Sequence, residues 1–144
     1  EARMFERILL PLDLDEPSSW AKALPVALGL CRKHGSHLTL GTVISDWDAA
    51  RDVQWSPLGY RRMIRDAEWR RRRSGESCGS VEHDVKVAGG AVGPTIVDLA
   101  GTIEADLIVL ASHRPGPKDY LIGAHALHVV RHATCSVFVV RDIP

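Results

Sequence analysis

The sequence contains few cysteines, no excess of charge and no long apolar run. Three cysteines occur among 144 residues, at Cys31, Cys78 and Cys135. They lie far apart and form no CxxC pair, so we expect reduced thiols in a cytoplasmic protein rather than a disulfide framework. Lys+Arg and Asp+Glu balance at 18 each. This balance argues against a protein that coats nucleic acid or inserts into a membrane surface.

Membrane-spanning segments and the standard phosphate-loop motifs are also missing. No apolar run approaches the roughly 18 residues that a spanning helix needs, and the start, EARMFERILLPLD, has no signal-peptide core. Neither GxxxxGK[ST] nor GxGxxG occurs. A length of 144 residues with 45% hydrophobic content fits one compact domain, residues 1–144.

Apolar runs alternate with segments of helical periodicity along the chain. We expect strands at 5–12, 37–44, 81–87, 106–111 and 136–140, and helices at 20–34, 57–73, 93–103 and 123–133. Ser18 or Ser19 should cap the first helix, and Pro25 should kink it. The alternation predicts an α/β fold: a single-domain, open, parallel five-stranded sheet of order 3-2-1-4-5 with helices on both faces.

That strand order places two loops at the most probable binding position. The first and fourth strands are neighbours where the winding reverses, and ligands of such sheets bind beyond the carboxyl ends of the strands at that point. The loops there are Pro11-Leu12-Asp13 and residues 112–122. Asp13 could accept hydrogen bonds from ribose hydroxyls, or it could only cap a turn.

The second loop contains groups that suit a phosphate. Ser112, His113 and Arg114 precede a helix that we expect to begin near Gly123. A helix start offers free N–H groups, an arginine can make bidentate contacts, and His125 at the start of that helix could face a phosphate. The alternative interpretation is a surface turn shaped by proline and glycine.

Three other patterns carry weaker signals. His125, His128 and His132 form a stripe in which the last two have the i, i+4 spacing that can share a metal. No cysteine or carboxylate joins them, so we interpret the stripe as a polar flank. The arginine-rich residues 61–73 favour a solvated helix face over the alternative of a nucleic-acid patch. No nucleophile with a base and an orienting group is visible.

Several motifs together resemble one known family. They are ILLPLDL at 8–14, TVI at 42–44, GGAVGPTIVDLA at 89–100 and DLIVLASHRPGPKDYLIGAHALHVVRHATCSVFVVR at 106–141. Outside residues 46–80, the chain resembles the universal stress proteins (the UspA family). The resemblance implies the adenine-nucleotide α-hydrolase-like fold and a homodimeric regulatory module of the stress response that binds ATP, with or without Mg²⁺. It implies at most weak ATP hydrolysis.

The resemblance also implies the binding residues. In the ATP-binding branch, the aspartate after strand 1 meets the ribose and the end of strand 2 contacts adenine through its backbone. Carried over to this chain, the cofactor-binding residues are Pro11, Leu12, Asp13, Val43, Ala111, Ser112, His113, Arg114, Gly123, Ala124 and His125.

The chain departs from that branch in its phosphate loop. Ala111 and Arg114 replace two glycines, Ala124 replaces a hydroxyl residue, and the loop is one residue shorter. Glycines let backbone N–H groups approach a phosphate closely, whereas His113 and Arg114 could supply positive charge instead. A Ser-His-Arg-Pro loop occurs in one subgroup of the family that is thought to bind ATP.

The last strand is the expected dimer interface. Family members commonly pair through it, and here it comprises Val137, Phe138, Val139 and Val140, an apolar edge with free hydrogen-bonding groups. Two other functions stay open on the sequence alone: a slow ATP hydrolase, and an interaction protein of the same fold that binds no nucleotide.

Overall fold

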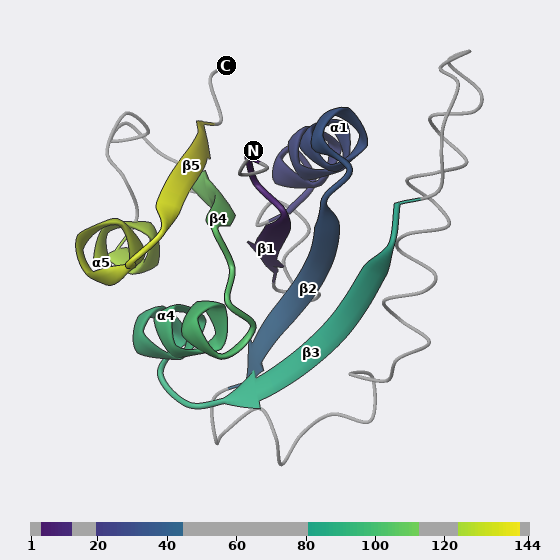
Figure 1. Ribbon diagram of the computed structural model, residues 1–144. Helices are drawn as coiled ribbons and strands as arrows, with labels where there is room; N and C mark the ends of the chain where they lie inside the picture. Colours follow the sequence, from purple (N-terminus) through teal and green to yellow (C-terminus); the bar gives the residue numbers. More distant parts are fainter. Residues whose placement is uncertain (1–3, 13–19, 45–80, 113–123, 142–144) are drawn as a thin grey trace.

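A parallel five-stranded sheet forms the centre of the molecule (Figure 1). The computed structural model describes residues 4–12, 20–44, 81–112 and 124–141. The elements in these ranges are β1 (Arg7–Pro11), α1 (Ala23–His34), β2 (His37–Ile44), β3 (His83–Gly89), α4 (Val92–Thr102), β4 (Leu107–Ser112), α5 (Ala124–His132) and β5 (Ser136–Arg141). The strand order is β3-β2-β1-β4-β5, and every neighbouring pair is parallel. Both the α/β class and the order match the sequence prediction.

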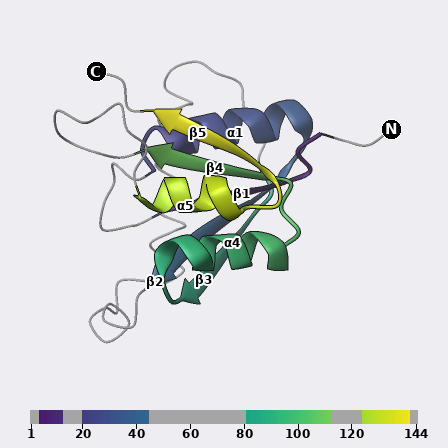
Figure 2. The same cartoon turned by 90° about the vertical axis from the view of Figure 1, so that its left-hand side faces the viewer.

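The helices form a layer on each face of this sheet. Ile8 and Leu10 of β1 pack toward α1, whereas Leu9 belongs to the cluster beneath α4 and α5. Figure 2 shows α4 and α5 side by side on one face, with α1 on the other. Because both faces are covered, β1 and β4 are buried as continuous apolar runs rather than as alternating ones. None of the described helices is long and apolar enough to cross a membrane.

A close approach of α4 to the sheet explains a glycine in the buried strand β2. A Cβ atom on Gly41 would lie 2.8 Å from Cδ2 of Leu99 and 3.1 Å from Cδ1 of Leu9. Both distances are shorter than ordinary van der Waals contact, so a larger residue would displace the Leu99 and Leu9 side chains from their packed positions.

The start of α1 differs from the sequence prediction. The helix begins at Ala23 with Lys22 as its N-cap and without a side-chain capping bond from that residue, so it starts three residues later than predicted. Ser18 and Ser19 lie outside the described residues. Pro25 is the third helical residue rather than an interior one. Leu24 just before it donates its N–H to the Trp20 carbonyl at 2.8 Å, and Pro25 has no N–H to continue this series. A proline in the first turn interrupts none of the hydrogen bonds within Ala23–His34. The end of the helix follows the prediction, because Gly35 adopts φ 66° and donates its N–H to the Cys31 carbonyl.

The first strand is shorter than the apolar run that predicted it. Phe5 adopts a left-handed φ of 57°, and Ser36 Oγ donates a hydrogen bond to its carbonyl. Asp106 then accepts the N–H groups of Glu6 at 2.7 Å and Arg7 at 2.9 Å. These charge-assisted bonds fix the amino ends of β1 and β4 beside each other.

The remaining elements agree with the prediction more closely. The strand expected at 81–87 lies at His83–Gly89 and is mostly exposed, as its alternating pattern indicated. The helix expected at 93–103 is α4, with Ile96 and Ala100 buried. The helix expected at 57–73, with its arginine-rich segment, lies outside the described residues.

Candidate functional site

β1 and β4 separate toward their carboxyl ends. The ladder between them pairs only Ile8 with Leu107 and Leu9 with Ile108. Farther along, β1 stays paired with β2 as far as Pro11, and β4 stays paired with β5 as far as Ser112. The backbones of these two neighbouring strands therefore part at the point where the winding reverses, which is where open α/β sheets bind ligands.

Ser112 occupies the last position of β4 at this end. It is only 4% exposed, and its Oγ has no hydrogen-bond partner among the residues that the structure describes. Strand alternation places its side chain on the same face as Leu110 and Ile108, the face that α5 covers. A buried hydroxyl without a partner costs about 1–3 kcal/mol. A ligand that accepts its hydrogen bond would remove that cost.

The exit of β1 is held by a second buried hydroxyl. Thr42 of β2 is fully buried, and its Oγ1 donates to the Leu12 carbonyl at 2.9 Å. The N–H of Leu12 in turn donates to the Gly41 carbonyl at 2.8 Å. Two hydrogen bonds to β2 thus fix the backbone immediately before Asp13. Thr42 was not among the predicted site residues, because a threonine within HLTLGTVI is typical of any strand.

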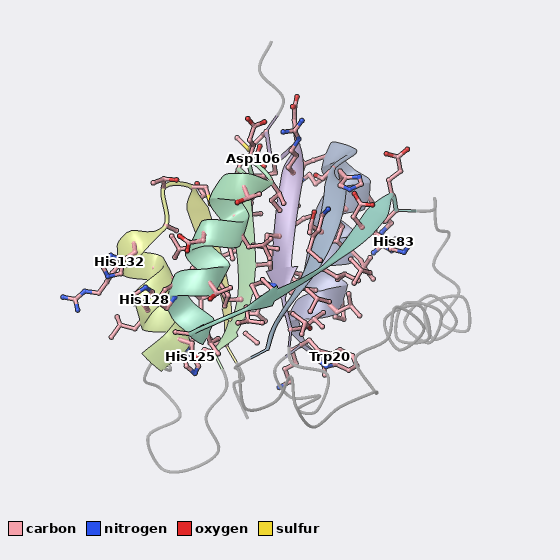
Figure 3. The ribbon with its side chains drawn as sticks, turned by 90° about the horizontal axis from the view of Figure 1, so that it is seen from below. Trp20, His83, Asp106, His125, His128 and His132 are labelled. Atoms are coloured by element: carbon pink, nitrogen blue, oxygen red, sulfur yellow. The ribbon has the colours of Figure 1, made fainter. Side chains whose placement is uncertain are left out.

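The start of α5 lies at the same end of the sheet. Figure 3 shows His125 and Trp20 at this end and Asp106 at the opposite one. The first-turn N–H groups of an α-helix are free to meet an anion, and the helix dipole favours negative charge there. His125 is exposed in that turn, where its imidazole could approach the same anion.

Trp20 contributes another polar atom that the sequence analysis missed. Its ring packs against the α1-side core, but its Nε1 is buried without a hydrogen-bond partner in the described ranges. The sequence treated Trp20 only as a helical core position. One feature of the sequence could have indicated this polar atom: a buried tryptophan usually pairs its indole N–H with an acceptor, and Trp20 follows a loop.

The structure separates the predicted site residues onto two faces of the sheet. Leu12 and Ala111 pack with the α1-side core, whereas Val43 packs with the α4 and α5 side. Pro11 ends β1 between them. Of Ala124 only the backbone is described, as the first residue of α5. Asp13, His113, Arg114 and Gly123 lie outside the described residues.

Comparison with known proteins gives the family. The model of the universal stress protein family matches residues 4–141, which is nearly the whole chain. The chain belongs to the universal stress protein family.

Individual relatives of the family are more distant. Universal stress protein G of Salmonella typhimurium is 38% identical over 52 residues, which cover 36% of this chain and 37% of that protein. A universal stress protein solved in complex with cAMP has a TM-score of 0.67 at 18% identity, over 96% of this chain and 98% of that chain. An Arabidopsis thaliana family member solved with AMP bound has a TM-score of 0.59 at 16% identity, over 94% and 92%. At these identities the two structures establish the shared fold.

Neither of the two cysteines that the structure describes in this universal stress protein adds chemistry to the site. Cys31 and Cys135 are free. Burial raises the pKa of Cys31 to about 11, against a smaller opposing effect of Arg32, and burial also raises the pKa of Cys135. Both therefore stay protonated near neutral pH, where a thiol is a weak nucleophile and a poor metal ligand. Within the described ranges, no three His, Cys, Asp or Glu side chains converge on a common point.

Proposed function

We propose that this chain binds an adenine nucleotide, ATP in particular, at the carboxyl ends of β1 and β4. The observation that carries the proposal is the buried Ser112 hydroxyl, which has no partner in the described residues and lies where β1 and β4 part. Solved relatives of the same fold hold cAMP and AMP, which supports an adenine nucleotide as the ligand. We further propose that residues 1–144 form one domain and that the protein acts in the cytoplasm as a stress-response regulator.

The residues present suit the parts of such a ligand. The Ser112 hydroxyl and the first-turn N–H groups of α5 would hold phosphate oxygens, with His113, Arg114, Gly123, Ala124 and His125 alongside. Asp13, following the fixed Leu12, would accept the ribose hydroxyls, and the backbone of Val43 would meet adenine. Trp20 adds an N–H donor at the same end, whose Nε1 has no partner among the described residues. A Mg²⁺ ion would be held chiefly by the phosphates, because it prefers oxygen ligands and retains water.

Replacing Ser112 with alanine tests whether its hydroxyl binds ATP or only stabilises the fold. The change should weaken ATP binding about tenfold, the loss expected for one hydrogen bond to a charged group. The stability of the nucleotide-free protein should stay the same or rise slightly, because the change removes a buried hydroxyl that has no partner among the described residues. Ser136→Ala is the matched control, since Ser136 is exposed at the amino end of β5 and should change neither quantity. Calorimetric titration with ATP and urea unfolding measure the two effects.

The ligand itself is identified from the purified protein. Protein prepared without added nucleotide is denatured, and the small molecules released are identified by mass spectrometry. Asp13→Ala and Arg114→Ala should each weaken ATP binding. If nothing is released and ATP produces no heat, the proposal fails. If both variants bind as tightly as the parent, the site is placed wrongly.

We also propose that the protein forms a homodimer through β5. This strand ends the sheet, so its outer backbone groups face away from β4. Phe138 within it is 45% exposed, and Leu127 and Val130 of the adjoining α5 are exposed apolar side chains as well. An apolar edge of this kind favours pairing with a second strand.

Phe138→Asp should make the protein monomeric at a concentration where the parent is dimeric. A buried aromatic side chain at an interface contributes about 2 kcal/mol or more, and the introduced charge would be desolvated on pairing. Val87→Asp is the control, because Val87 is equally exposed on β3 at the opposite edge. Light scattering coupled to size exclusion gives the masses. A parent that is monomeric at high concentration would remove the proposal.

A further inference from the structure

Two histidines of α5 lie in contact on the flank beside α4. His128 and His132 are one helical turn apart, their ring centroids are separated by 4.3 Å, and the ring planes are inclined by 37°. Figure 3 shows both along α5, away from His125 at the helix start. Side chains at positions i and i+4 point to the same face of a helix, so the two rings lie on one flank of α5.

The position of His128 is restrained by the neighbouring helix. A Cβ atom added to Gly93 of α4 would lie 2.9 Å from Cγ and Cδ2 of the His128 ring. The backbone of α4 therefore borders one side of this imidazole, which is half-buried, while His132 is exposed. A ligand group whose rotamer is already restricted loses less entropy when it binds.

Neither imidazole has another role among the described residues. His37 contacts Asp84 at 2.8 Å through its Nε2, and His34 packs edge-on against the Phe5 ring. His128 and His132, by contrast, form no hydrogen bond or ion pair within the described ranges beyond their mutual ring contact. Their ring nitrogens are available to an exogenous ligand.

We propose that His128 and His132 chelate a divalent transition-metal ion, each through one ring nitrogen. Metal–imidazole bonds are about 2.0–2.1 Å long, so two nitrogens on one ion lie no more than about 4 Å apart. The ring centroids are 4.3 Å apart, and rotation about the side-chain bonds of the exposed His132 would bring one nitrogen of each ring within that limit. No third protein ligand is present in the described residues, so water completes the coordination. Imidazole ligands select Cu²⁺, Ni²⁺ and Zn²⁺ with Cu²⁺ bound most tightly, and they discriminate against Mg²⁺ and Ca²⁺.

Metal titration of the tag-free full chain, without nucleotide, tests the site. Calorimetry with Zn²⁺ should give one ion per chain, and substoichiometric Cu²⁺ should broaden the backbone NMR signals of α5 around residues 128–132 first. His132→Ala should weaken Zn²⁺ binding about tenfold or more. This exposed position tolerates truncation, and His128→Ala should produce the same loss. His83→Ala, which removes an exposed histidine from β3, should leave binding unchanged, and Mg²⁺ should not compete.

Two results would overturn the assignment. One is Zn²⁺ binding by His132→Ala as tight as by the parent protein. The other is Cu²⁺ broadening that is as strong around His34, His37 or His83 as around α5. Because the measurement contains no nucleotide and changes no residue of the proposed nucleotide site, neither result bears on nucleotide binding.

Discussion

Replacing Ile108 with alanine should lower the free energy of unfolding by about 2–5 kcal/mol. Ile108 is completely buried in the interior strand β4, where it is paired with Leu9 of β1 and Val137 of β5. Its side chain belongs to the apolar cluster beneath α4 and α5. Strands on both sides and helices above leave the site little freedom to collapse, so most of the deleted volume would persist as a cavity.

A graded series makes this prediction specific. Ile108→Val removes one methylene group and should cost about 0.5–1.5 kcal/mol. Val87→Ala removes apolar atoms from a strand residue that is 52% exposed, and its effect should stay within about 0.5 kcal/mol. Urea unfolding at one protein concentration gives the values, provided that the m-value is unchanged. A loss for Ile108→Ala no larger than that for Val87→Ala would contradict the layer arrangement.

The fold could be predicted from the sequence because the patterns that indicate it each involve many residues. A strand buried on both faces appears as an unbroken apolar run, as in DLIVLA, and parallel strands joined by helices permit few strand orders. Each of these signals depends on many residues, so an error at one position changes little. The class and the order 3-2-1-4-5 were therefore predicted correctly.

Element boundaries depend instead on single contacts between distant residues. The start of β1 is determined by Asp106, whose carboxylate meets the Glu6 and Arg7 backbone across about a hundred positions of sequence. No local sequence pattern around Phe5 indicates this contact with Asp106.

The candidate site was located by topology, but its critical contacts were not visible in the sequence. The strand order placed Ser112 at the switch point. Its burial and its lack of a partner among the described residues are properties of packing, and a serine before a proline loop reads equally well as a turn. The role of Thr42 could not be predicted from the sequence either, because it depends on where the Leu12 carbonyl lies after folding.

Replacing Thr42 with valine should cost about 1–3 kcal/mol of stability, although the two side chains have nearly the same shape. The change removes the donor to the Leu12 carbonyl, and both groups of this hydrogen bond are buried. Thr42→Ser keeps the hydroxyl and loses only a methyl group, so it should be the milder variant. Thr39→Val on the same strand is the matched control, because Thr39 is also buried but forms no hydrogen bond through its side chain within the described ranges.

Thr42→Val should also change the geometry of the proposed nucleotide site. Without the Thr42 contact, the backbone at Leu12 keeps only its N–H bond to Gly41, so the direction of the chain entering Asp13 is less defined. Thr42→Val should therefore weaken ATP binding as well as folding, whereas Thr42→Ser should bind ATP like the parent. Calorimetry well below the unfolding midpoint keeps the two effects apart. Wild-type stability in Thr42→Val, or a greater loss in Thr42→Ser, would show that the hydroxyl does not hold the exit of β1.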